Sequence, residues 1–296
     1  MNNLTKKMEE CNYIFCAVDL HQNSMLAGIA VNKTDIEYHP FDTDEGSGIA
    51  DLVQTLYDIK KDLPGSQVWV AYEASGCGFR LADIVEDEGF RISVLAPTHL
   101  PVSQKNRSNK TDKRDVRRIM DVLRGHVLAG NELPEVWIPS PDLRDDREIV
   151  RRRLEIKEQM ADVKNRIHGL LRRYGHKKPD SIRTNWSKGH IRWLYSRLDK
   201  LDAGASKHLS SLLREFEFYF EESDLLEREL LALSQTDRYE AQVDALNEIK
   251  GVAVLTAMVF LTELGDMSRF DNRRRLASYL GLSPKCFESG EQDDRK

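Results

Sequence analysis

The chain has 296 residues, of which 40% are hydrophobic and 31% charged, and its net charge is -5. This length fits one large domain or two to three smaller ones, and the apolar content is enough for buried cores, which excludes general disorder. The longest apolar stretch, near residues 252–264, is interrupted by Glu263 and is too short to span a bilayer, so a membrane span is excluded.

Cysteine usage and the N-terminus indicate a cellular compartment. The four cysteines include no CxxC pair and no histidine at zinc-finger spacing, so we expect neither a disulfide framework nor a structural zinc site. The N-terminus has only a brief apolar run before Asp19, which argues against a secretory signal. We therefore expect a cytoplasmic protein with reduced thiols.

The first 130 residues predict an α/β domain with a mixed sheet. Short apolar runs with β-branched and aromatic residues indicate strands, and apolar residues at three- and four-residue spacing indicate helices. The expected strands are 13–19, 24–31, 35–41, 67–73 and 91–95, and the expected helices are 48–61, 79–89 and 112–127. Three strands followed by alternating helices and strands are typical of a layered α/β fold.

The rest of the chain predicts helices. Residues 131–145 carry several prolines and are interpreted as a linker, and residues 146–240 contain two heptad patterns. These two helices could fold back as an antiparallel hairpin or pair with another chain. Residues 241–296 contain a tight turn near Gly251 and an apolar helix ending at Gly265, which fits either a phosphate-binding helix-hairpin-helix element or a plain helical hairpin.

Charges are unevenly distributed along the chain. Residues 99–126 and 144–200 are basic, whereas residues 215–248 are acidic. This pattern fits a polyanion-binding face beside a solvated or partner-facing one, and it also fits two ordinary solvated helix faces. Charge alone leaves both interpretations open.

Four acidic residues form the main candidate site. Asp19 and Glu73 end two apolar strands, where a carboxylate is unfavourable unless it is paired or bound to a metal, and Asp112 and Asp115 are one helical turn apart. If the first and fourth strands are neighbours, the four carboxylates converge and would repel each other without divalent cations. Oxygen ligands select Mg²⁺ or Mn²⁺, and two such ions could act on a phosphodiester.

Each of these acids also has an ordinary structural interpretation. Asp19 and Glu73 could be turn or strand-end residues. Asp112 could be an N-cap, and Asp115 could be a solvated acid favoured by the helix dipole. The order strand-Asp, strand-Glu, basic loop and helix with Asp-x-x-Asp is more specific than any of its parts.

Several segments together resemble the IS-110 / IS-1111 family of DEDD transposases and the related Piv-type DNA invertases. The resemblance covers nearly the whole chain, in the segments FCAVDLH, VWVAYEASG, NKTDKRDV, IKGVAVLTAMVFLTELGDMSRF and RRLASYLGLSPKCFESG. It implies a RuvC-like domain of the RNase H-like fold in residues 1–130. It also implies a helical coiled-coil region and a C-terminal α-helical transposase domain.

The resemblance also implies a mechanism and partners. Asp19, Glu73, Asp112 and Asp115 match the family's metal-binding carboxylates, and Ser289 matches the serine that attacks DNA to form a 5′-phosphoserine link. The implied partners are donor and target DNA, a structured guide RNA and further copies of the chain in a dimer or tetramer.

Two further expectations concern the end of the chain and its activity. The family's pattern continues past the serine with a basic Gly-Asn-containing segment, whereas this chain ends at Lys296, so we expect a truncated C-terminal domain. Two other functions fit the residues: a RuvC-like nuclease or resolvase that uses metal-activated water, and an inactive remnant that binds nucleic acid.

Overall fold

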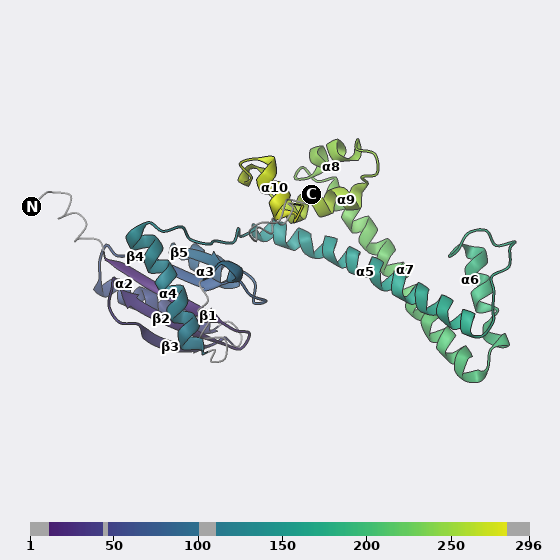
Figure 1. Cartoon of the computed structure of the whole chain (residues 1–296), viewed down its shortest axis with the longest axis horizontal. Helices are drawn as coiled ribbons and strands as arrows, with labels where there is room; N and C mark the ends of the chain where they lie inside the picture. Colours follow the sequence, from purple (N-terminus) through teal and green to yellow (C-terminus); the bar gives the residue numbers. More distant parts are fainter. Residues whose placement is uncertain (1–11, 44–46, 101–110, 283–296) are drawn as a thin grey trace, which may run out of the picture. The chain divides into compact units, whose positions relative to one another are not determined.

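The computed structural model describes residues 12–43, 47–100 and 111–282 (Figure 1). These residues form two compact units that divide between Ile138 and Pro139. Within the described residues, no helix combines the length and the apolar character needed to cross a membrane.

The first unit contains the expected mixed sheet. Its strand order is β3-β2-β1-β4-β5, with β1 antiparallel to β2 and parallel to β4. The strands are β1 (Tyr13–Leu20), β2 (Ser24–Val31), β3 (Glu37–Asp42), β4 (Gln67–Glu73) and β5 (Arg91–Leu95). The second, fourth and fifth strands have the predicted bounds, and the third begins two residues later than predicted.

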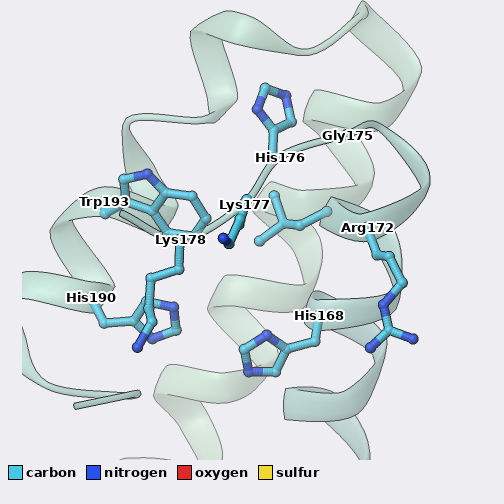
Figure 2. A pocket seen from close by; sticks show the side chains of 9 residues that line it. His168, Arg172, Gly175, His176, Lys177, Lys178, His190 and Trp193 are labelled. Carbon is cyan, nitrogen blue, oxygen red and sulfur yellow. The ribbon is translucent and has the colours of Figure 1, made fainter. Parts of the chain in front are cut away.

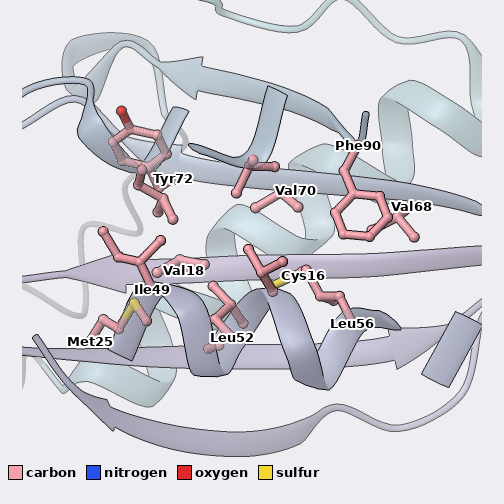
Figure 3. Close-up of a cluster of buried hydrophobic side chains, with 14 of the residues drawn as sticks. Cys16, Val18, Met25, Ile49, Leu52, Leu56, Val68, Val70, Tyr72 and Phe90 are labelled. Atoms are coloured by element: carbon pink, nitrogen blue, oxygen red, sulfur yellow. The ribbon is translucent and has the colours of Figure 1, made fainter. Parts of the chain in front are cut away.

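Helices cover both faces of this sheet. Helices α2 (Ser47–Asp62) and α3 (Arg80–Asp87) pack on one face, and α4 (Asp112–Ala129) packs on the other. Because side chains alternate along a strand, Cys16 and Val18 contact the first core, shown in Figure 3, whereas Phe15 and Ala17 contact the core under α4.

Small residues let α4 approach the sheet closely. Ala17, Gly28, Ala30 and Ala71 lie under this helix on three adjacent strands. A Cβ atom added to Gly28 would be only 2.3 Å from Cγ1 of Val116, which is on α4. The sequence therefore sets the distance between the sheet and the helix that carries Asp112 and Asp115.

The first part of the predicted linker is paired with the sheet. The N–H of Ala96 donates to the carbonyl of Pro134 at 2.8 Å, and the N–H of Val136 donates to that of Val94 at 2.7 Å. Val136 also packs against the core of the first unit. These residues provide hydrogen-bond partners for the outer edge of β5. The strand pattern in the sequence did not indicate this pairing. The division into segments 1–130, 131–145, 146–240 and 241–296 stays a prediction.

The second unit is built on two long helices that fold back on each other. Helices α5 (Pro141–Arg173) and α7 (Ala203–Ser234) share one apolar core. Arg153 pairs with Glu227 at 2.8 Å, and Arg166 pairs with Glu215 further along. Because the partner numbers fall as the α5 numbers rise, the two helices are antiparallel. Of the two arrangements that the heptads predicted, the described chain adopts the intramolecular hairpin.

Shorter helices pack at the two ends of this hairpin. Helix α6 (Lys188–Tyr195) joins the core shared by α5 and α7, and α8 (Glu240–Asn247) and α9 (Val254–Leu264) form a second core with Val150 and Leu230. Helix α10 (Arg273–Tyr279) follows. Gly251 has a φ of 94° in the turn before α9, as glycine readily allows. A phosphate-binding role for this turn stays a prediction.

Candidate metal centre

Two of the predicted acids lie side by side at the ends of β1 and β4. The parallel register pairs Val18 with Tyr72, so Asp19 and Glu73 are the next residues on the two strands. Val18 and Tyr72 belong to the core under α2 and α3. By alternation, Asp19 and Glu73 are on the opposite face, which α4 covers. The first and fourth strands are thus neighbours, which is the condition under which the acids were expected to converge.

The other two acids lie in the first turn of α4. Thr111 occupies the N-cap position with extended backbone angles, and Asp112 is the first helical residue. Asp112 is thus not the N-cap, which was one interpretation of the sequence. The Asp115 side chain is 14% exposed, whereas Asp112 is exposed. Burial of Val116 against the sheet orients this turn toward the strand ends.

One group of side chains offers three candidate metal ligands close together. Oxygen atoms of Asp19 and Asp112 and a ring nitrogen of His21 all lie within 4.8 Å of one another. His21 Nε2 is 3.3 Å from Asp19 Oδ2. Sequence reasoning missed His21, although residues two positions apart in an extended chain, such as Asp19 and His21, point to the same side.

Glu73 and Asp115 are brought together by a basic residue of α4. Arg118 donates to Glu73 Oε2 at 2.6 Å, and the same guanidinium nitrogen is 3.6 Å from Asp115 Oδ1. Arg118 was not among the predicted site residues, although it is one helical turn after Asp115. The structure thus groups Asp19 with Asp112, and links Glu73 to Asp115 through Arg118. Binding of divalent ions by all four carboxylates stays a prediction.

The electrostatics of Asp19 favour a bound cation. Burial raises the pKa of the Asp19 carboxyl above its usual value, His21 lowers it, and the carboxylates of Asp112 and Asp115 raise it further. A cation between these groups would offset both the burial and the repulsion. Two carboxylates and an imidazole are suitable ligands for Mn²⁺, and the carboxylates also suit Mg²⁺. The residues present therefore fit a divalent ion.

Some predicted features lie outside the described residues. These are Ser289, the candidate nucleophile, and the part of the basic loop that carries Lys105, Arg107 and Lys110. Of the cysteines in the described ranges, Cys16 is buried and Cys77 is half-buried, and both are free thiols.

Comparisons with known proteins relate both units to transposases. A sequence model of IS110-type DEDD transposases, described as "Transposase", matches residues 16–176, which include all four acids. The model described as "Transposase IS116/IS110/IS902 family" matches residues 243–296, which include Ser289. Together the two matches extend over most of the chain.

Individual relatives are also named as transposases. "Putative transposase y4qE" of Sinorhizobium fredii is 28% identical over 77% of this chain and 53% of its own length. "Transposase for insertion sequence element IS1533" of Leptospira borgpetersenii is 23% identical over 75% of this chain and 62% of its own length. "Transposase for insertion sequence element IS1111A" of Coxiella burnetii is 23% identical over 69% of this chain and 53% of its own length. The chain thus spans little more than half the length of these relatives.

Proposed function

We propose that this chain, which belongs to the IS110 family of DEDD transposases, cleaves and exchanges DNA strands with a divalent metal ion bound in its first unit. The observation that carries the proposal is the group formed by Asp19, His21 and Asp112, whose ligand atoms lie within 4.8 Å of one another. The first unit would be the RuvC-like, RNase H-like catalytic domain. The mixed sheet with its parallel pair β1 and β4 supports this proposal.

The residues of the site would have separate roles. Asp19 and Asp112 would hold Mg²⁺ or Mn²⁺, with His21 as a third donor. A bound ion of this kind polarises a phosphodiester and stabilises the charge that develops on its oxygens. Arg118 contacts the Glu73 and Asp115 carboxylates and neutralises part of their charge.

The remaining steps would depend on the second unit. Ser289 would attack the DNA phosphodiester and form a 5′-phosphoserine link, releasing a 3′-hydroxyl. A structured guide RNA would pair with donor and target DNA, and the chain would act as a dimer or tetramer. The support for these steps is the resemblance of the segment around Ser289 to the family and the match of residues 243–296.

Ion binding tests the metal centre directly. Calorimetric titration with Mn²⁺ and Mg²⁺ should show binding to the unmodified chain, and Asp19→Asn and Asp112→Asn should weaken it by about tenfold or more. Asp87→Asn is the matched control, because Asp87 is an exposed acid at the end of α3. If the Asp19 variant binds as tightly as the control, the site assignment is wrong.

Cleavage of DNA that carries the ends of the encoding element tests the chemistry. We expect Mg²⁺-dependent cleavage that is lost in Asp19→Asn, with a covalent protein–DNA adduct that is lost in Ser289→Ala. Cleavage without an adduct would instead support a nuclease or resolvase that uses metal-activated water. Ion and DNA binding without cleavage under any condition would support a nucleic-acid-binding remnant.

A further inference from the structure

A basic pocket lies between the C-terminal end of α5 and α6 in the second unit (Figure 2). We call it the hairpin pocket. Its volume is about 390 Å³, within the range of ligand-binding cavities. Nine residues of the described ranges line it, and none of these is acidic. The polar and basic ones are His168, Arg172, His176, Lys177, Lys178 and His190.

His190 lines this pocket and carries a buried hydrogen-bond donor. The residue is fully buried, and its Nδ1 accepts the backbone N–H of Trp186 at 2.9 Å. An imidazole that accepts through Nδ1 carries its proton on Nε2, so Nε2 is a donor. This Nε2 has no hydrogen-bond partner in the part of the chain that the structure describes. A buried donor without an acceptor is unfavourable, so an oxygen from a ligand would complete the site.

The charges around the pocket favour an anion. Burial lowers the pKa of His168, and the positive charges of Arg172 and Lys178 lower it further. Carbonyls near the end of α5 could oppose an anion, but two of them already accept backbone hydrogen bonds. The N–H of Tyr174 donates to Leu170, and that of His176 donates to Leu171. The net field is therefore that of the basic side chains.

A metal ion is a poorer occupant than an anion. Three basic side chains, Arg172, Lys177 and Lys178, would repel a cation. In the described residues, the group arranged to hold an ion is in the first unit.

We propose that the hairpin pocket binds a backbone phosphate of a nucleic acid, with the Nε2–H of His190 and the side chains of Arg172 and Lys177 as donors. This inference rests on the proposed function, since a DNA-recombining protein meets its phosphates in nucleic acid. Arginine and lysine are the usual partners of phosphate oxygens, and such contacts hold a nucleic acid without reading its sequence. The pocket would thus position DNA or RNA on the helical hairpin.

Nucleic-acid binding by two double variants tests the proposal. Binding of a fluorescein-labelled DNA duplex and of an RNA hairpin is measured by anisotropy, with EDTA present and in an Asp19→Asn background. Arg172→Gln/Lys177→Gln should weaken binding of at least one probe by about tenfold, and the slope of log K against log salt should become shallower by about 1. Lys157→Gln/Arg173→Gln is the matched control, because it removes one lysine and one arginine of α5 that are exposed and do not line the pocket.

A pair of histidine variants isolates the buried donor. Asparagine at position 190 can keep an acceptor near the Nδ1 position and removes the Nε2–H, whereas glutamine can keep a donor near Nε2 and loses that acceptor. We therefore expect His190→Asn to lose nucleic-acid affinity while hydrogen exchange in α6 is retained. His190→Gln should loosen the start of α6 but bind more tightly than His190→Asn.

Titration with inorganic phosphate separates the possible ligands. Nuclear magnetic resonance of the His190 ring should show a shift with phosphate, and the labelled oligonucleotides should displace it. If phosphate shifts the ring but the two double variants bind nucleic acid equally, the pocket takes only small anions and the proposal is wrong. Equal binding with no shift also overturns it. Because ion binding and cleavage play no part, failure here leaves the metal-centre proposal intact.

Discussion

Replacing Gly28 with alanine should displace the helix that carries Asp112 and Asp115. The added Cβ would lie 2.3 Å from Cγ1 of Val116 and 2.8 Å from Cγ2 of Ile36. Carbon atoms in contact are about 3.5–4.0 Å apart, so Val116 would have to move by roughly 1.2 Å or more. Val116 follows Asp115 directly, so this movement should reach the carboxylates.

The expected size of the effect follows from packing. Overpacking of a well-filled core destabilises a protein by about 1–3 kcal/mol. A shift of this kind in a residue that supports metal ligands should weaken Mn²⁺ affinity by about tenfold or more. Hydrogen exchange of the β1 and β4 amides reports the stability of the first unit without contributions from the second, and calorimetry reports the affinity.

A compensating substitution makes this test specific. Val116→Ala alone should destabilise the first unit by about 2 kcal/mol, because it leaves a cavity against the sheet. In Gly28→Ala/Val116→Ala the new methyl group takes the vacated space, so the combined loss should be smaller than the sum. Gly204→Ala is the control, since no atom lies within 4 Å of its added Cβ. Additive losses, or unchanged ion affinity in Gly28→Ala, would refute the reasoning.

Three further predictions concern basic residues and one carboxylate. Arg147 donates to the carbonyls of Thr262 at 2.6 Å and Glu263 at 3.0 Å at the end of α9. Arg147→Met should therefore destabilise this helix by about 2–4 kcal/mol and speed its hydrogen exchange. Arg152→Met is the control and should have little effect, because the Arg152 side chain is 43% exposed. The hydrogen bond from Arg151 holds the pKa of Glu263 below its ordinary value of 4.5, so folded Glu263 binds fewer protons than unfolded Glu263. The contribution of Glu263 to the stability of α9 should be constant above pH 4.5 and fall as the pH drops through the folded pKa. Glu263→Gln should remove this pH dependence from the hydrogen exchange of α9. Arg118→Gln removes a positive charge that competes with a metal ion for Glu73 and Asp115. The Mn²⁺ affinity measured by calorimetry should therefore rise. A fall in affinity would mean that Arg118 instead orients the two carboxylates.

The sequence predicted the local elements of the first unit well, because their apolar patterns match the geometry of single strands and helices. Strands β2, β4 and β5 have the predicted bounds, and α4 begins at the predicted Asp112. Alternation along a strand also places Asp19 on the same face as Phe15 and Ala17. These properties depend on residues close together in the chain.

Contacts between distant segments were decided only by the tertiary structure. The heptads allowed both an intramolecular hairpin and pairing with another chain, because the same apolar seam can be buried by either partner. The edge pairing of Val136 with Val94 follows from the path of the chain after α4. The link from Arg118 to Glu73 joins residues 45 positions apart, and a long flexible side chain finds such a partner only once the sheet and helix are packed.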